Sequence, residues 1–265
     1  MSYVQSLQIR HEERAALLQR AIEVLTGDRR VVAAWLFGSL GRGDADDLSD
    51  IDLWVVVADE HIEVVRSTKR EYICYVGEPL LIEEAPQNAP PGGAYLLALY
   101  GGEAGPHQVD WYWQPQSSAR LPQDTRLLFD RVGVQPAEPL PAMTHEARVE
   151  AASGKYAFFW AMANITAKKI ARREGWTVLR MLDMLKYTSD EVHWLVGVRD
   201  DRPTYESGFT ALPPVQPSEQ LALLRELAEE MEALSPELAR LGSDVSPEAI
   251  RQTYTFLGVV QSILH

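Results

Sequence analysis

Apolar residues in the first half of the chain follow spacings that are typical of strands. Residues 31–37 form a continuous apolar run that ends at Gly38, which predicts a buried strand. Over residues 50–57 every second position is apolar, and the positions between them include Asp50 and Asp52. Side chains alternate between the two faces of a strand, so this second strand should bury its apolar face and present both aspartates on the other.

Other segments complete a domain of strands and helices. Residues 11–26 carry apolar residues at three- and four-residue steps, which predicts a helix. A turn-rich segment, 86–93, separates further runs with strand character. We expect these additional strands at 72–76, 80–83, 95–100, 109–113 and 127–132. Residues 1–135 are therefore predicted to form a mixed-sheet α/β domain.

The second half of the chain has a different pattern. Three prolines within residues 135–141 mark a linker. Beyond it the apolar spacing is helical, and we expect helices at 155–173 with a start near Thr144, at 176–196, at 218–234 and from Ser246 onward. The predicted fold class is α/β (α+β), with the sheet domain at 1–135 followed by a helical domain at 142–265.

The composition is that of an ordinary globular protein. Apolar residues make up 46% of the chain and charged residues 24%. No apolar run approaches the roughly 18 residues of a membrane span, and the first residues lack the apolar segment of a secretion signal. Cys74 is the only cysteine, which fits a reducing compartment. We therefore expect a cytoplasmic protein with no membrane partner.

The formal net charge of −13 bears on the choice of partners. A strongly negative surface repels the phosphates of nucleic acids unless a basic patch overrides it. The sequence has no evident basic patch with interleaved aromatic residues. A cationic or neutral small molecule is therefore a better match than DNA or RNA, while the oligomeric state stays open.

A glycine and a serine directly follow the first predicted strand. Gly38 lets the backbone approach a ligand closely, and Ser39 adds a hydroxyl donor. A strand that leads through such a turn into a helix points backbone N–H groups at one place, where phosphate oxygens bind. Arg42 adds a positive charge that suits phosphate geometry. These three residues are therefore predicted to bind phosphate groups.

Asp50 and Asp52 are the first candidates for a metal site. Two carboxylates on one strand face repel each other unless a cation lies between them. Hard oxygen ligands of this kind select Mg²⁺, which also binds triphosphate oxygens. Phosphoryl-type transfer depends on such positioning and charge neutralisation, and two metal ions can clamp the attacking and leaving oxygens.

A third carboxylate is expected on a neighbouring strand. Asp110 is the favoured candidate because apolar or aromatic residues flank it. It would bind the catalytic metal and accept the proton of the acceptor as a general base. Glu83, in the strand expected at 80–83, is the alternative. The three side chains 50, 52 and 110 are expected to converge on divalent cations.

The order of these residues along the chain resembles the motif of the DNA polymerase beta nucleotidyltransferase superfamily. Gly38-Ser39 comes first, Asp50-x-Asp52 follows, and Asp110 lies on a later strand. Within it, the chain looks like the antibiotic-modifying branch, which includes the kanamycin, streptomycin and lincosamide nucleotidyltransferases. The motif match covers residues 31–57 and 109–113. The resemblance implies that Gly38 and Ser39 hold the β- and γ-phosphates, that Arg42 contacts the triphosphate, and that the three aspartates bind Mg²⁺.

The resemblance also implies an activity. The chain would move a nucleoside monophosphate from a nucleoside triphosphate, ATP by preference, to a hydroxyl of a small molecule such as an aminoglycoside-like antibiotic. Two alternatives stay open, namely nucleotidylation of a protein hydroxyl and a non-catalytic nucleotide-binding module. Protein-modifying members of minimal size are usually shorter, and a pure binder would not need three carboxylates.

Two further groups of residues have competing interpretations. Trp111, Tyr112 and Trp113 are expected to pack in the core and at its rim rather than to stack on an acceptor. Several lysines and arginines of the helical half have two interpretations: they contact the triphosphate, or they are ordinary surface charges. They are Lys155, Lys168, Lys169, Arg172, Arg173 and Lys186.

Overall fold

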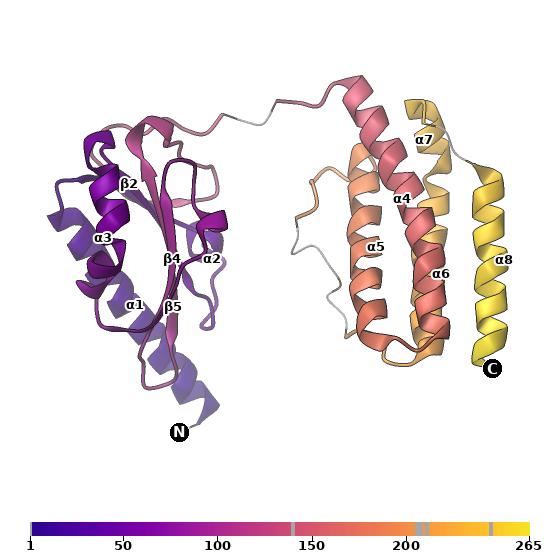
Figure 1. Cartoon of the computed structure of the whole chain (residues 1–265), viewed down its shortest axis with the longest axis horizontal. Helices are drawn as coiled ribbons and strands as arrows, with labels where there is room; N and C mark the ends of the chain where they lie inside the picture. The colour runs from indigo at the N-terminus through magenta and orange to yellow at the C-terminus, as the bar shows by residue number, and fades with distance from the viewer. Residues whose placement is uncertain (1, 139–140, 205–208, 210–211, 244–245) are drawn as a thin grey trace. The chain divides into compact units, whose positions relative to one another are not determined.

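The computed structural model describes residues 2–138, 141–204, 209, 212–243 and 246–265. The chain divides into two compact units, Met1–Leu140 and Pro141–His265 (Figure 1). The division falls within the proline-rich segment at 135–141. Each unit has its own hydrophobic core, one between a sheet and helices and the other among helices.

The first unit is built on a six-stranded sheet in the order β3-β4-β5-β2-β1-β6. Its central pair, β2 and β5, is parallel, and every other neighbouring pair is antiparallel. The strands are β1 (Val31–Phe37), β2 (Ile51–Val57), β3 (Pro79–Glu83), β4 (Ala94–Tyr100), β5 (His107–Pro115) and β6 (Arg126–Asp130). The mixed sheet expected from the sequence is therefore confirmed.

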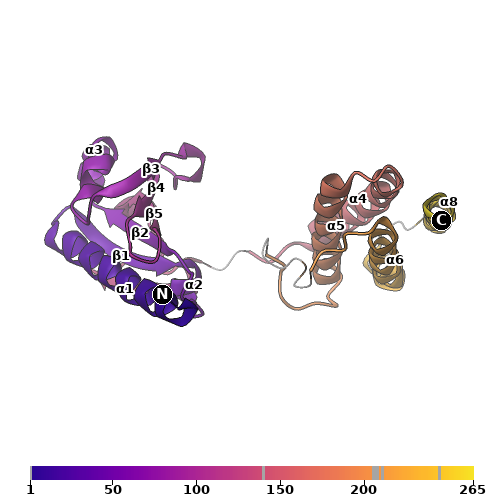
Figure 2. The same ribbon diagram turned by 90° about the horizontal axis from the view of Figure 1, so that it is seen from below.

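Helices cover one face of this sheet, and Figure 2 shows α1 and α3 on the same side. The helices of the unit are α1 (Tyr3–Gly27), the single turn α2 (Gly38–Arg42) and α3 (Ile62–Cys74), with short 3-10 turns at Asp59–His61, Pro86–Asn88 and Gln116–Ser118. The covered face carries alternate residues of the strands, such as Ile51, Leu53 and Val55, all within the main core. The opposite face carries the residues between them, including Asp52.

Helix α1 begins at Tyr3, earlier than the predicted start at residue 11. Ser2 and Gln5 form a capping box, in which the Ser2 hydroxyl accepts from the Gln5 amide and the Gln5 side chain accepts from the Ser2 amide. This arrangement satisfies N–H groups that a helix start otherwise leaves without a partner. Leu17 and Leu25 then bury the face of the helix that lies against the sheet.

The strand expected at 72–76 is wrong, because these residues form the end of α3 and the turn after it. The segment is rich in residues that favour strands, but its apolar positions also fit a helix. Ile62, Val65, Tyr72 and Ile73 are buried on one side of α3 and pack on the sheet. Burial of that helical stripe outweighs the local strand preference, which depends strongly on context.

The second unit consists of helices gathered around α4. Its elements are α4 (His145–Ala171), α5 (Gly175–Leu195), α6 (Pro217–Ala233), α7 (Ser235–Leu241) and α8 (Pro247–Leu264). Helix α4 contacts each of the other four helices, and Ala152, Phe159 and Ala163 on it are fully buried. The predicted helical region is confirmed, including the hydroxyl caps that Thr144 and Ser246 provide. Helix α7 was not predicted from the sequence.

Candidate active site

The turn between β1 and α2 brings the backbone against an aspartate. Gly38 has φ +61, in the left-handed region that favours glycine. A Cβ atom added there would lie 2.2 Å from Oδ2 of Asp52. No side chain fits in this space, so glycine at position 38 is what allows the turn and the carboxylate to lie together.

Asp52 lies on the sheet face opposite the helices. Its neighbours in β2, Ile51 and Leu53, are buried in the main core, so Asp52 projects to the other side. Asp50 directly precedes β2 and lies outside the strand. In the register of the sheet, Asp52 pairs with Phe37 on β1 and with Asp110 on β5. Paired positions on neighbouring strands are about 4.8 Å apart.

Asp110 is 6% exposed, and both of its carboxylate oxygens accept hydrogen bonds. The Tyr95 hydroxyl donates to Oδ1, and the Gln108 side-chain amide donates to Oδ2 at 2.6 Å. The alternative carboxylate, Glu83, pairs with Leu97 on β4. It lies on the edge strand β3, and β4 and β5 separate it from β2. The sheet therefore brings Asp110, and not Glu83, beside Asp52.

The three aspartates act electrostatically on one phenol. Burial, followed by the negative charges of Asp110, Asp52 and Asp50, raises the pKa of Tyr112 to about 12. Tyr112 lies on β5 two residues beyond Asp110, on the same face of the sheet. The side of the sheet that carries the aspartates is thus a local region of negative potential.

Among the described residues, no group of three or more His, Cys, Asp or Glu side chains is arranged so that it could hold a metal ion. Asp52 and Asp110 share a face of the sheet and are paired in register, and Asp50 directly precedes β2. The expectation that all three converge on one cation stays a prediction. Carboxylate oxygens are nevertheless the donors that suit Mg²⁺.

Four aromatic rings cross the same face of the sheet beside the aspartates. They are Trp35 on β1, Trp54 on β2, Tyr112 on β5 and Tyr95 on β4. Their centroids are separated by 6.3 Å, 4.8 Å and 5.0 Å in that order, and the two pairs that include Trp54 are stacked. The stacked faces already contact one another, so this aromatic row stabilises the strands that carry Asp52 and Asp110.

Trp111 and Trp113 lie on the other face of β5 and are 0% exposed. Their predicted packing role is confirmed, because both belong to the main core against the helices. Tyr112 differs from its neighbours, since it belongs to the aromatic row on the aspartate face. Alternation along the strand therefore separates three adjacent aromatic residues into two environments.

Arg14 of α1 fixes the loop that leads to Asp50. It is 7% exposed, and its Nη1 donates to the carbonyl oxygens of Asp46 at 2.5 Å and of Ser49 at 2.8 Å. The Asp46 carboxylate accepts from the Ser49 hydroxyl and the Leu48 amide, which lower its pKa. The sequence did not identify Arg14, because an arginine on an amphipathic helix resembles a surface charge.

The positively charged residues that the sequence offers for contact with the triphosphate lie at the end of α2 or in the helical unit. Nε of Arg42 donates to Oδ2 of Asp44 at 3.0 Å at the end of α2. In the helical unit, Lys155, Lys169 and Lys186 form ion pairs with Glu191, Glu174 and Asp190, respectively. Lys168, Arg172 and Arg173 are exposed there.

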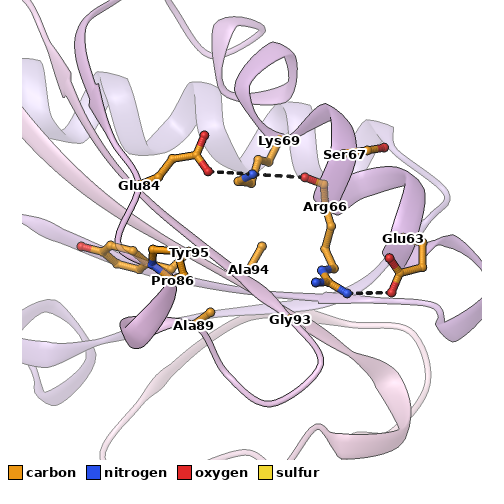
Figure 3. Close-up of a pocket in the computed structure, with 10 residues that line it drawn as sticks. All are labelled: Glu63, Arg66, Ser67, Lys69, Glu84, Pro86, Ala89, Gly93, Ala94 and Tyr95. Atoms are coloured by element: carbon orange, nitrogen blue, oxygen red, sulfur yellow. Dashed lines mark hydrogen bonds and ion pairs between the residues drawn. The ribbon is translucent and has the colours of Figure 1, made fainter.

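Two hollows lie near these residues within the first unit. One, of about 220 Å³, is lined by Asp50 and Gln108 together with Arg10 and Arg14. The other, of about 370 Å³, lies between α3 and the segment before β4 (Figure 3). Its charged walls are ion-paired, Arg66 with Glu63 at 2.7 Å and Lys69 with Glu84 at 3.0 Å. None of the residues that line the second hollow is a site residue predicted from the sequence.

A comparison with known protein families finds a match within the first unit. Residues 19–78 match the family model described as "Polymerase beta, Nucleotidyltransferase". The matched segment contains the Gly38-Ser39 turn and both Asp50 and Asp52. The resemblance that the motif indicated is therefore confirmed over this part of the first unit, which supports nucleotidyl transfer in general.

No curated protein sequence matches the chain. One solved structure that is similar to it is described as "Crystal structure of an aminoglycoside 6-adenyltransferase from Bacillus subtilis". The identity is 12%, the TM-score is 0.33, and the match covers 94% of this chain and 97% of that one. Within the described part of the chain, every helix is too short or too polar to cross a lipid bilayer.

Proposed function

We propose that the chain moves the nucleoside monophosphate of a nucleoside triphosphate, ATP by preference, to a hydroxyl group of a small molecule. The observation that carries the proposal is the placement of Asp52, which is paired with Asp110 on the parallel neighbour strand and lies against Gly38. The family match over residues 19–78 supports nucleotidyl transfer in general.

In this reaction the acceptor oxygen bonds to the α-phosphorus of the nucleotide. The bond from that phosphorus to the bridging oxygen of the β-phosphate breaks, and pyrophosphate leaves. The acceptor proton passes to the Asp110 carboxylate as general base. Gly38 and Ser39 hold the terminal phosphates, and Arg42 contributes a positive charge beside them.

Asp50, Asp52 and Asp110 are the residues that would hold Mg²⁺. The fit rests on their chemistry, since all three are hard oxygen donors, and burial together with their combined negative charge raises the pKa of Tyr112. When bound, the cation neutralises charge on the triphosphate and the developing charge of the leaving group.

The acceptor that suits this chain is a cation. The net charge of −13 and the aspartate face favour a cationic acceptor that carries hydroxyl groups, such as an aminoglycoside-like antibiotic, over an anionic acceptor. Modification of such a hydroxyl would confer antibiotic resistance. This assignment rests on charge complementarity, whereas transfer itself rests on the arrangement of the aspartates.

The test uses the full chain with ATP labelled at the α-phosphate, Mg²⁺ and a panel of aminoglycosides, lincosamides and proteins. Label on a small molecule, with release of pyrophosphate, is the expected result. Label on a protein hydroxyl would instead establish the alternative of protein nucleotidylation. Binding of ATP without transfer to any acceptor, in a preparation that is fully folded, would favour a nucleotide-binding module and contradict the proposal.

A further inference from the structure

The carboxylate of Asp110 is held from two sides by uncharged donors. Oδ1 accepts from the Tyr95 hydroxyl, and Oδ2 accepts from the Gln108 amide at 2.6 Å. Asp110 itself is 6% exposed, so water has little access to replace either bond. A carboxylate oxygen has two acceptor sites. Each oxygen of Asp110 therefore keeps one site for a further partner.

Tyr95 reaches Asp110 from the neighbouring strand. In the antiparallel register of β4 and β5, Tyr95 pairs with Tyr112, and Asp110 pairs with Leu97. The Tyr95 ring is 6% exposed and lies 5.0 Å from the ring of Tyr112. Figure 3 shows its hydroxyl pointing away from the ion pairs of the neighbouring pocket. Packing thus leaves the ring little freedom, and the hydroxyl is directed at Asp110.

Gln108 completes the arrangement from the same strand as the carboxylate. Residues two apart on a strand share a face, so the side chains of Gln108 and Asp110 project together. Gln108 also lines the hollow beside Asp50. An amide at this position donates to Asp110 without bringing another negative charge to the aspartate face.

We propose that Tyr95 and Gln108 are positioning residues that hold the Asp110 carboxylate in one rotamer for a divalent cation. The inference rests on the proposed function, because it takes Asp110 as a metal ligand. Hydrogen bonds to a ligating side chain fix its orientation, and their loss typically weakens metal binding by about 10- to 100-fold. Both residues would act through Asp110, to which each donates a hydrogen bond.

The test measures binding of Mn²⁺, as a paramagnetic substitute for Mg²⁺, to the full chain by electron paramagnetic resonance. The variants are Tyr95→Phe and Gln108→Leu, with Asp110→Asn as the reference for a lost ligand. We expect Mn²⁺ affinity to fall about tenfold or more in both positioning variants. Circular dichroism and the melting temperature check that each variant is folded.

Two matched controls come from the same strands. Tyr100→Phe removes a buried hydroxyl of β4 that donates to the Ile73 carbonyl on the helical side. Gln114→Leu removes a buried amide of β5 whose Nε2 has no hydrogen-bond partner among the described residues. Both controls should bind Mn²⁺ as the unaltered chain does, which separates positioning of Asp110 from a general loss of packing.

The outcomes separate this inference from the proposed function. Weaker binding in Tyr95→Phe and Gln108→Leu, with unchanged controls, supports the positioning role. Unchanged or tighter binding in those two variants, while Asp110→Asn loses Mn²⁺, overturns the positioning role and leaves Asp110 as a ligand. Unchanged binding in Asp110→Asn overturns both the positioning role and the assignment of Asp110, whereas nucleotidyl transfer itself is decided by the labelling assay.

Discussion

The two faces of the sheet are made of the same strands but differ in chemistry. On the helical face, Ile51, Leu53 and Trp111 are buried in a continuous apolar core. On the other face, Asp52 and Asp110 lie side by side beside the aromatic row. Since side chains alternate, a single strand supplies stability through one set of residues and candidate chemistry through the other.

The largest expected effect comes from the aspartate face. Asp52→Asn removes a proposed cation ligand, and transfer of labelled nucleotide should fall by about 1,000-fold or more, since charge neutralisation at a phosphoryl centre contributes several kcal/mol. The melting temperature should not fall, because the substitution relieves repulsion between neighbouring carboxylates. Asp47→Asn, at a half-buried position of the preceding loop where the carboxylate pairs with His11, is the control and should retain transfer. Transfer at the original rate in Asp52→Asn would refute the metal assignment.

Leu53, which follows Asp52 in β2, tests the helical face. Leu53 is 0% exposed, and Leu53→Ala should lower the free energy of unfolding by about 2–5 kcal/mol, through lost burial and the cavity that remains. Transfer by the fraction that stays folded should be unchanged. Urea unfolding, together with the labelling assay on the same samples, measures both quantities. A variant that keeps full stability but loses transfer would contradict the division between the two faces.

A smaller effect is expected from Arg14, which crosses from the helical face to the loop before Asp50. Arg14→Met removes the donor to the Asp46 and Ser49 carbonyls. We expect kcat/KM to fall about tenfold, because a small displacement of a catalytic group is costly. Arg20→Met is the matched control on the same helix, since Arg20 donates only to the Val76 carbonyl in the described structure, at 3.1 Å. Equal losses in the two variants would show that Arg14 acts through stability alone.

Much of this arrangement follows from short-range patterns in the sequence. The alternation at 50–57 predicts which side of β2 carries Asp52, and the apolar run at 31–37 predicts β1. The segment at 72–76 was assigned incorrectly, because its local preference for a strand is weaker than burial of one side of α3. A local pattern therefore predicts an element correctly where burial against the rest of the fold favours the same element as the local residue preference.

The contacts that complete the site depend on pairing between distant segments. Whether Asp110 or Glu83 lies beside Asp52 is decided by the parallel register of β2 and β5, which no spacing within one segment reveals. Tyr95 reaches Asp110 only because β4 pairs with β5, and Arg14 reaches residues 46 and 49 only because α1 packs on the sheet. A composition or motif search therefore finds the carboxylates but not the residues that hold them.

The smallest expected effect is on how the free energy of unfolding depends on pH, through a tyrosine on the aspartate face. Tyr112 keeps its proton in the folded chain up to a pKa of about 12, whereas an unfolded tyrosine releases it near pH 10. Between these values the folded chain binds more protons than the unfolded chain, so the free energy of unfolding decreases as pH rises through this window. Tyr112→Phe removes this contribution, and its urea midpoint should decline less between pH 9 and pH 11, values chosen on either side of the ordinary tyrosine pKa of about 10.

The exposed Tyr75 provides the control, and Tyr75→Phe should follow the unaltered chain over the same pH interval. The contribution at Tyr112 also depends on the aspartates, since their negative charge is part of what raises its pKa. In an Asp52→Asn background the effect of Tyr112→Phe on the urea midpoint should therefore shrink. An effect of the same size with and without the Asp52 carboxylate would mean that the charge of Asp52 does not contribute to the raised pKa of Tyr112.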